Sequence, residues 1–178
     1  VKLAFAFAEL LNQEARALAA DGIDIVQFDE PAFNVYMAAA ADWGVAALER
    51  ARQGLTCKTA VHICYGYGID ANNKWKNTLG QEWRQYEQVF PALARSSIDQ
   101  VSLECMHSHV PLDLIGLLAG KEVMVGVIDV ANDAIESPEE IANPFGGYAG
   151  ADHSPDRPER ARTARRSASA FEKIRRLV

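Results

Sequence analysis

Four short apolar segments alternate along the chain with longer stretches in which apolar residues recur every three or four positions. The four segments are residues 23–29, 58–64, 100–104 and 122–129, and each contains Val or Ile and ends on polar residues. Near-continuous apolar runs of this length are typical of parallel strands that are covered on both faces. We therefore predict four buried strands.

The stretches between these strands have helical periodicity, as in residues 9–20, where Leu11, Ala15 and Leu18 share one stripe. The other predicted helices are 37–53, 81–95 and 112–119. Regular alternation of helix and strand indicates parallel βα units. Four strands are too few for a closed eight-stranded barrel of about 250 residues. An open doubly wound sheet is the alternative, although the first strand-to-helix turn lacks a glycine-rich phosphate cradle.

Composition narrows the class of protein. The chain has 178 residues, of which 49% are hydrophobic and 24% charged, as in an average globular domain. No stretch reaches the roughly 18 apolar residues of a membrane span. Three cysteines without framework spacing disfavour a disulfide-stapled secreted domain and favour a cytoplasmic one. The net charge of −6 disfavours nucleic acid as a partner.

The charge is unevenly distributed along the chain. From Asn143 onward seven Arg and one Lys face four acidic residues, so this segment carries +4 and the preceding 142 residues carry −10. The segment is also rich in Ser and Pro, which is typical of disorder, with a short basic helix expected at its end. We predict a folded domain over residues 1–142 and a basic tail over 143–178.

Polar residues follow each of the four predicted strands. Asp29 and Glu30 end the first, His62 and Cys64 the second, Glu104 the third and Asp129 the fourth. In both candidate architectures the catalytic and ligand-binding residues lie at the carboxyl ends of the strands. Four polar strand ends in succession therefore predict a functional site.

His62 and Cys64 are two residues apart on a strand, so their side chains share one face. Imidazole and thiolate together are ligands well suited to zinc. A histidine that bonds to backbone beside an inert core cysteine is the alternative. Glu104 is a candidate third ligand, or else a carboxylate paired with a neighbouring base.

Other polar residues have less specific interpretations. Asp29 and Glu30 are candidates for holding a substrate ammonium group, and Asp129 is a candidate catalytic residue or a loop cap. Cys57 lies about 23 Å from Cys64 along an extended strand, so it is expected to be structural. Cys105 should face away from the site, and His107 and His109 are second-choice ligands from the following loop. The long loop 66–80 is expected to be a lid over the site or a solvated insertion.

The motifs at these strand ends resemble the cobalamin-independent methionine synthase family. They are DEPA at 29–32, HICYG at 62–66, SLE ending at Glu104 and GVIDV at 126–130, in that family's order. The resemblance covers residues 1 to about 142 and implies the second half of a catalytic (β/α)8 barrel, of the short single-domain type. It also implies that the chain is a piece of a longer protein.

The resemblance implies zinc-dependent methyl transfer from a methyl-folate-type donor to the thiol of homocysteine, giving methionine. It implies a zinc held by one His, two Cys and one Glu, of which His62, Cys64 and Glu104 match three. Zinc lowers the pKa of a bound thiol and so delivers a thiolate at neutral pH. Asp29 matches the acid that holds the amino group of homocysteine.

Three family residues have no counterpart in this sequence. The fourth ligand, a Cys in an Asn-x-Cys-Gly turn, is replaced by the stretch at 143–147, and no cysteine follows Cys105. The family's proton-donating His falls on Ala131, and its folate-contacting acid falls on Val35. The lost motif and the changed composition coincide near Ala142, which suggests a shifted reading frame or a gene-model error there.

Three functions stay open at this level. The first is an enzyme of the methionine synthase type, or a piece of one, whose open sheet edges are expected to pair in a homodimer. The strand-end acids could instead serve another methyl transfer or a decarboxylase-like reaction on a related barrel. The third outcome is an inactive barrel fragment that binds a partner or has no activity.

Overall fold

The computed structural model describes residues 1–64, 70–79, 83–105, 108, 110–128, 133, 135–138 and 141, without the side chains of residues 71, 72 and 112. The chain divides into two compact units, residues 1–137 and 138–178. Almost all of the second unit, including the expected basic tail, lies outside the described residues.

Strands and helices alternate along this unit, as the sequence pattern predicts. The elements are α1 (Lys2–Ala20), β1 (Ile25–Asp29), η1 (Pro31–Asn34), α2 (Met37–Ala39), η2 (Ala40–Gly44), α3 (Val45–Arg52), β2 (Lys58–Ile63), α4 (Asp70–Lys76), η3 (Arg84–Gln88), α5 (Phe90–Arg95), β3 (Gln100–Glu104), α6 (Leu112–Ile115), η4 (Gly116–Leu118) and β4 (Glu122–Gly126). The four strands form one parallel sheet in the order β1-β2-β3-β4. Sequential order with helical crossovers is the arrangement of consecutive βα units in a barrel.

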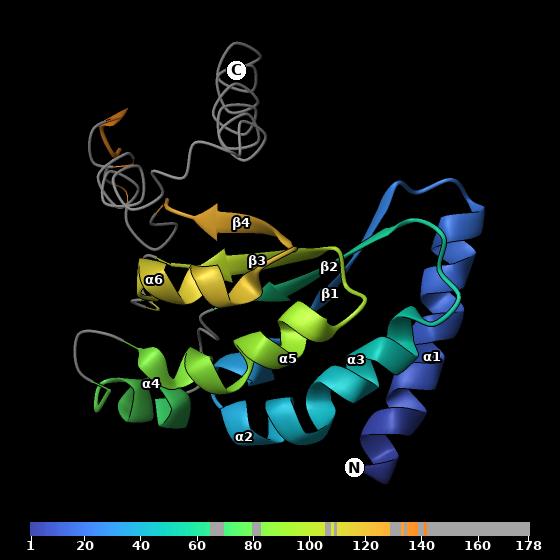
Figure 1. The fold of residues 1–178 in the computed structure, drawn as a ribbon, viewed down its shortest axis with the longest axis horizontal. Coiled ribbons are helices and arrows are strands. Elements are labelled where there is room, and N and C mark those ends of the chain that lie inside the picture. The colour runs from blue at the N-terminus through green and yellow to red at the C-terminus, as the bar shows by residue number, and fades with distance from the viewer. Residues whose placement is uncertain are drawn as a thin grey trace. The chain divides into compact units, whose positions relative to one another are not determined.

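The helices α2, α3 and α5 lie on one side of the sheet (Figure 1). Side chains alternate accordingly along the strands. The residues that face the helices are buried: Val26, Phe28, Thr59, Val61, Ile63, Val101 and Leu103. The residues between them are mostly half-buried or exposed: Gln27, Asp29, His62, Ser102, Glu104 and Met124. The prediction of strands covered on both faces is therefore wrong for the part of the chain that the structure describes, because helices cover one face only.

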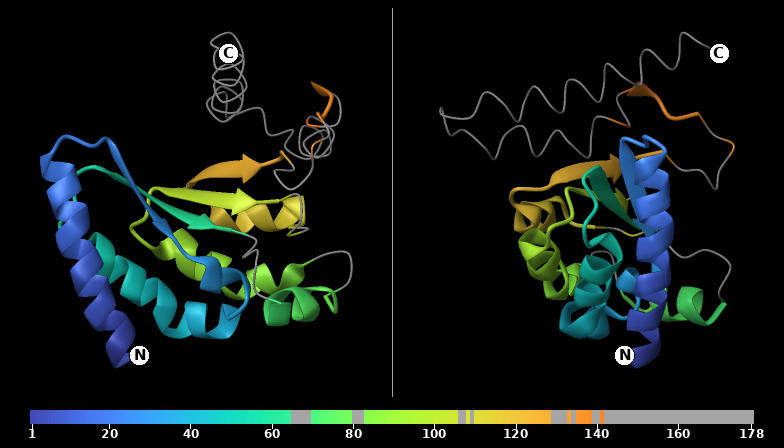
Figure 2. Two further views of the ribbon diagram at one scale, coloured as in Figure 1. Left: turned by 180° about the vertical axis from the view of Figure 1, so that it is seen from behind. Right: turned by 90° about the vertical axis from the view of Figure 1, so that its right-hand side faces the viewer.

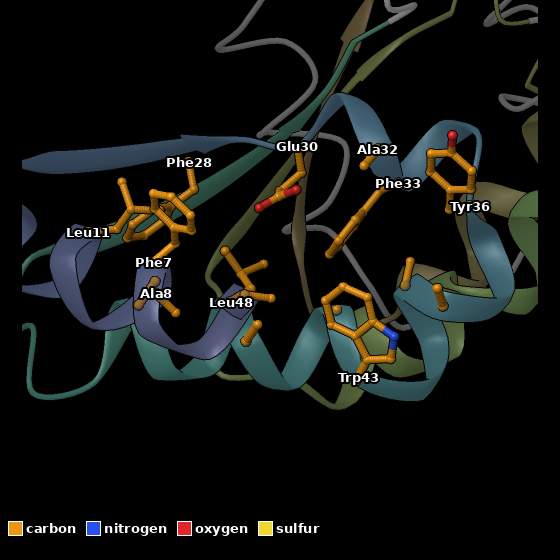
Figure 3. Close-up of a pocket in the computed structure, with 16 residues that line it drawn as sticks. Phe7, Ala8, Leu11, Phe28, Glu30, Ala32, Phe33, Tyr36, Trp43 and Leu48 are labelled. Carbon is orange, nitrogen blue, oxygen red and sulfur yellow. The ribbon is translucent and has the colours of Figure 1, made fainter. Parts of the chain in front are cut away.

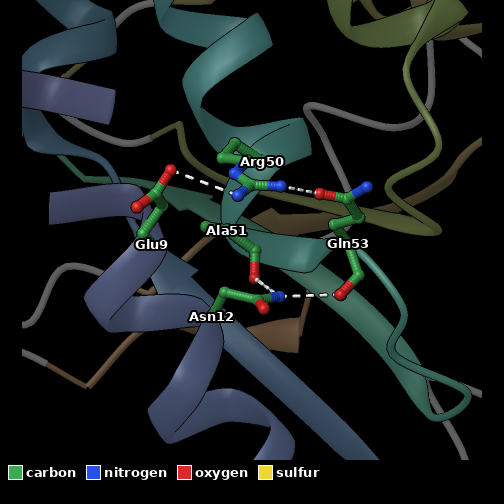
Figure 4. A network of polar contacts seen from close by, with 5 residues as sticks. All are labelled: Glu9, Asn12, Arg50, Ala51 and Gln53. Atoms are coloured by element: carbon green, nitrogen blue, oxygen red, sulfur yellow. Dashed lines mark hydrogen bonds and ion pairs between the residues drawn. The ribbon is translucent and has the colours of Figure 1, made fainter. Parts of the chain in front are cut away.

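Helix α1 begins at Lys2, so the predicted helix over 9–20 extends almost to the first residue. It ends at Ala20, and Gly22 then takes a positive φ of 89°, a conformation that costs glycine little. The side chain of Asn12 donates to the carbonyl oxygens of Ala51 (2.8 Å) and Gln53 (2.7 Å) at the end of α3 (Figure 4). Glu9 and Arg50 add an exposed ion pair of 3.1 Å. These contacts join α1 to α3.

The predicted loop over 66–80 contains a helix, α4, whose last residue Lys76 is 2% exposed. The segment is thus anchored at Lys76, whereas Asp70, Lys74, Asn77 and Thr78 are exposed. Residues 65–69 and 80–82, which flank α4, lie outside the described residues. Within the described parts of the chain, every helix is too short or too polar to cross a membrane.

Candidate functional site

His62 and Cys64 lie at the carboxyl end of β2, on the sheet face that the helices leave open. Both side chains are half-buried, whereas Ile63 between them is fully buried on the other face. His62 is in register with Ser102 of β3, and its Nδ1 lies 2.9 Å from the Ser102 hydroxyl oxygen. A hydrogen bond at one imidazole nitrogen orients the ring and leaves Nε2 as the nitrogen suited to a ligand.

Glu104 ends β3, directly beside the end of β2. Because Ile63 pairs with Leu103, the next residues, Cys64 and Glu104, are level on neighbouring strands. Parallel strands lie about 4.8 Å apart, so the two side chains share one small region of the open face. The Oε2 atom of Glu104 accepts hydrogen bonds from the Ser108 backbone N–H (3.0 Å) and hydroxyl (2.8 Å). These bonds hold the carboxylate at the edge of the sheet.

The chemistry of these three side chains fits zinc, which accepts imidazole, thiolate and carboxylate ligands. Their placement on the sheet is also compatible with a common zinc site, because His62 and Cys64 share a face and Glu104 is level with Cys64. Nevertheless, in the described ranges no three His, Cys, Asp or Glu side chains come close enough together to hold one metal ion. His107, His109 and Asp129, the further candidates from the sequence, lie outside those ranges.

A buried lysine lies near the ends of β2 and β3. Lys76 of α4 is 2% exposed, and its Nζ lies 5.8 Å from the centre of the Trp83 ring. Burial lowers the pKa of Lys76, while the nearby negative charges of Cys64 and Glu104 act to raise that pKa. Lys76 lies within 66–80, where the sequence predicts a loop, so the sequence alone does not bring this residue to the site.

Tyr86 of η3 is buried beside the same strand ends. Burial raises its pKa, and a hydrogen bond with Ser108 opposes that effect. Ser108 therefore connects the carboxylate of Glu104 to the Tyr86 hydroxyl. Lys76, Tyr86 and Ser108 together form the polar surroundings of the Cys64 and Glu104 pair.

Asp29 and Glu30 point to opposite sides of the sheet, although they are adjacent in sequence. Asp29 is in register with His62, is exposed, and accepts a 2.9 Å hydrogen bond from the side chain of Gln27. It therefore lies on the same face as His62. Glu30 instead extends into an apolar pocket between α1, β1 and α3 (Figure 3). Of the two acids, the structure brings only Asp29 to the zinc-ligand candidates.

The pocket around Glu30 has a volume of about 460 Å³. Its lining is otherwise apolar and includes Phe7, Leu11, Phe28, Phe33, Trp43 and Leu48. Burial among these side chains raises the pKa of the Glu30 carboxyl.

The other two cysteines pack against the hydrophobic core. Cys57 precedes β2 at its amino end, as expected from its distance along the strand. Cys105 also packs against the core, on the side away from the open face. Its burial, with a smaller effect of the Glu104 charge, raises its thiol pKa to about 12. Cys64 therefore differs from both in lying on the open face.

Comparison with known proteins shows to which family the chain belongs. Residues 2–151 match the family model described as the catalytic domain of cobalamin-independent synthase. The chain belongs to this family. The resemblance of the four strand-end motifs is thereby confirmed.

Relatives of this family include named methionine synthases. The chain is 32% identical over 142 residues to the methionine synthase of Sulfurisphaera tokodaii, covering 79% of this chain and 36% of the relative. It is 34% identical over 143 residues to that of Saccharolobus islandicus, covering 79% and 37%. The chain thus spans little more than a third of the length of these relatives.

A solved structure shares the fold. It is that of a B12-independent methionine synthase from Shewanella sp. W3-18-1 in complex with selenomethionine. The likeness has a TM-score of 0.74 with 63% identity, and it covers 82% of this chain and 42% of that one. The prediction of an α/β fold representing part of a (β/α)8 barrel is confirmed, and the open sheet face corresponds to the side that faces the inside of a barrel.

Proposed function

We propose that this chain carries the homocysteine-activating part of a zinc-dependent methyltransferase, with His62, Cys64 and Glu104 as zinc ligands. The observation that carries the proposal is the alignment of Cys64 with Glu104 beside the His62–Ser102 pair, on the open face of a family member's sheet. Homocysteine and a methyl-folate-type donor are the proposed substrates, and methionine is the product. Because the chain spans 36–42% of its relatives, the complete reaction is proposed for the longer protein.

Each residue of the site has a defined task in this proposal. Zinc, when bound, supplies a positive centre that lowers the pKa of the homocysteine thiol. His62 would bind through Nε2, with Ser102 orienting its ring. Asp29, in register with His62, would hold the substrate ammonium group by an ion pair. Its exposure on the open face leaves room for a substrate there.

The selenomethionine bound by the Shewanella relative supports this assignment of substrate. That ligand differs from methionine only in its chalcogen atom, so it has the amino and carboxyl groups of the proposed product. At 63% identity, we expect the same class of amino acid to bind to this chain. Asp129, outside the described residues, stays the proposed catalytic residue, and Glu30, which lies in the apolar pocket, is less suited than Asp29 to bind substrate.

The decisive experiment is a measurement of zinc content and zinc affinity of the purified chain. We expect about one zinc per chain, as in a single protein-bound site, and its loss in His62→Ala and in Cys64→Ser. Cys57→Ser is the matched control, because Cys57 lies at the other end of β2 and should not affect zinc. Zinc retained in both site variants would refute the proposed ligands, and a wild-type chain without zinc would favour an inactive fragment or another reaction.

We further propose that a second copy of the chain covers the exposed apolar surface of α1 and the β1 edge. This surface includes Leu3 (70% exposed), Phe7 (57%), Leu10 (59%) and Ile25 (44%). Exposed apolar surface of this kind beside an open strand edge favours association. Sedimentation equilibrium should show a dimer that Leu10→Glu dissociates, whereas a stable wild-type monomer would contradict the proposal.

A further inference from the structure

Asn34 is a fully buried asparagine at the end of η1, close to the end of β2. Its exposed fraction is 0%, and its side-chain Nδ2 donates a hydrogen bond to the backbone carbonyl of Cys64. The two residues are 30 positions apart in sequence, so this bond joins separate elements. Among the described residues the other amide atom, Oδ1, has no hydrogen-bond partner. The side chain is therefore held in place by its bond to Cys64.

The position of this bond follows from the ladder between β1 and β2. In parallel strands, every second backbone N–H of one strand donates to every second carbonyl of its neighbour. The last such bond here runs from the Glu30 N–H to the His62 carbonyl, at 2.8 Å. The next would run from Ala32 to Cys64.

The ladder cannot continue through the backbone beyond Glu30. The chain turns at Pro31 into η1, so Ala32 is in a 3-10 helix and no longer in a strand. A proline also has no N–H and disfavours continuation of the strand. The partly buried Cys64 carbonyl would thus lose its donor from the ladder. The amide of Asn34 supplies it from the other end of the same short helix.

We infer that Asn34 is a positioning residue of the proposed zinc site. Its side chain extends the β1–β2 ladder to Cys64, which keeps this residue in the strand alternation that places its thiol on the same face as His62. Without that bond the chain after Ile63 would be free to rotate, and the thiol would spend less time near His62 and Glu104. The inference rests on the proposed function, because it gives Cys64 the part of a metal ligand.

Asn34→Leu tests this inference, since leucine has the same branched shape, although a larger volume, and no donor. Residues that orient a metal ligand typically contribute 10- to 100-fold to metal affinity. We therefore expect the zinc dissociation constant, measured by competition with a chromophoric chelator, to rise about 10-fold or more. Asn34→Ala serves as a second variant that cannot overfill the site, with thermal unfolding used to confirm that both variants fold.

Asn12→Leu is the matched control. Asn12 also joins two elements by donating from its side chain to backbone carbonyls, those of Ala51 and Gln53, but at the end of α3 (Figure 4). It should lower the unfolding temperature and leave zinc affinity within about twofold of the wild type. Equal loss of zinc affinity in the Asn12 and Asn34 variants would show a general effect of destabilisation and overturn the inference.

A second readout does not depend on zinc. In the metal-free protein, the alkylation rate of Cys64, measured by peptide mass spectrometry, should rise several-fold in Asn34→Leu and stay unchanged in Asn12→Leu. If the wild type binds no zinc but this rate rises, the proposed function fails and the positioning role stands. If folded Asn34→Leu and Asn34→Ala both keep wild-type zinc affinity and Cys64 reactivity, the positioning role is refuted.

Discussion

The two faces of the sheet use the same four strands for different purposes. On β1, β2 and β3 the covered face consists of Val, Ile, Leu and Phe side chains with 0–7% exposure, together with Thr59, while Val123 and Val125 of β4 are half-buried. The open face carries His62, Ser102 and Glu104 with Asp29 beside them. Because successive strand residues point to opposite sides, a single strand supplies both sets. Burial of the first set stabilises the fold, while the second remains available for chemistry.

The two faces also differ in how the hydrogen-bonding groups of their polar side chains are satisfied. On the covered face the buried hydroxyl of Thr59 is paired with a carboxylate of Asp99 at 3.0 Å. On the open face, His62 has a hydrogen bond to Ser102 and is half-exposed. Polar groups on the covered face must therefore be satisfied within the protein, whereas those on the open face can exchange partners with a ligand or with water.

Among the largest expected effects is that of Leu103→Ala on the covered face. Leu103 is 1% exposed, and truncation of such a residue leaves a cavity that costs about 2–5 kcal/mol. Urea unfolding measures this loss. Ser102→Ala, one residue earlier on the open face, is the control and should cost less than about 1 kcal/mol. Similar losses for both variants would mean that the two faces do not differ as described.

Thr59→Val should lower the free energy of unfolding by an intermediate amount that depends on pH. Burial alone would raise the pKa of Asp99. Hydrogen bonds from the Thr59 N–H (2.8 Å) and hydroxyl, with the charges of Arg52 and Lys58, instead lower this pKa below its ordinary value. A carboxyl whose pKa is lowered by folding stabilises the protein above its unfolded pKa, and this contribution is lost as the pH falls through the folded value.

At pH 7 the loss of the Thr59 hydroxyl should therefore cost about 1 kcal/mol of unfolding free energy. The cost should shrink below about pH 4, where Asp99 takes up a proton in the unfolded chain. Urea unfolding at both pH values measures the difference. A cost that is independent of pH would show that the Asp99 carboxylate does not act through this bond.

Ser102→Ala should affect zinc more than stability. It removes the hydrogen bond that orients His62 on the open face, so zinc affinity should fall about 10-fold. Isothermal titration with zinc measures this change, and Ser102→Thr should restore most of the affinity because it keeps the hydroxyl. Unchanged affinity in Ser102→Ala would show that the His62 ring is oriented by other contacts.

The smallest expected effect is that of Gln27→Ala. Gln27 is exposed on the open face, and its 2.9 Å bond to Asp29 competes with water. The unfolding free energy should change by less than about 0.5 kcal/mol. Phe28→Ala, the adjacent residue on the covered face, should cost about 3–5 kcal/mol in the same urea experiment. A large effect of Gln27→Ala would indicate that the open face is covered in solution.

Some elements could be predicted from sequence with their bounds. The strand over 100–104 has the predicted residues, and 58–64 and 23–29 each differ by one or two residues at one end. The strand over 122–129 ends at Gly126 instead, because periodicity gives the type of an element better than its end. The sequence does not predict the helix α4, since five of its seven side chains are polar and they leave no clear apolar stripe.

The site was predicted in its residue types and only partly in its arrangement. Polar residues at strand ends, and the spacing of His62 and Cys64, are properties of the sequence and follow from the two-residue period of a strand. The level position of Cys64 and Glu104 depends on the register of two strands about 40 residues apart, which local sequence does not define. Asn34 and Lys76 reach the site from separate helices, so only tertiary contacts identify them.

The sequence by itself determined the alternation of strands and helices, the family and the side chains that can bind a metal, because these depend on residue type and on spacing along the chain. The tertiary structure decided which sheet face is covered, that Asp29 and Glu30 lie on opposite sides, and that Asn34 bonds to Cys64. These features depend on which surfaces pack together, and packing joins residues that are far apart in sequence.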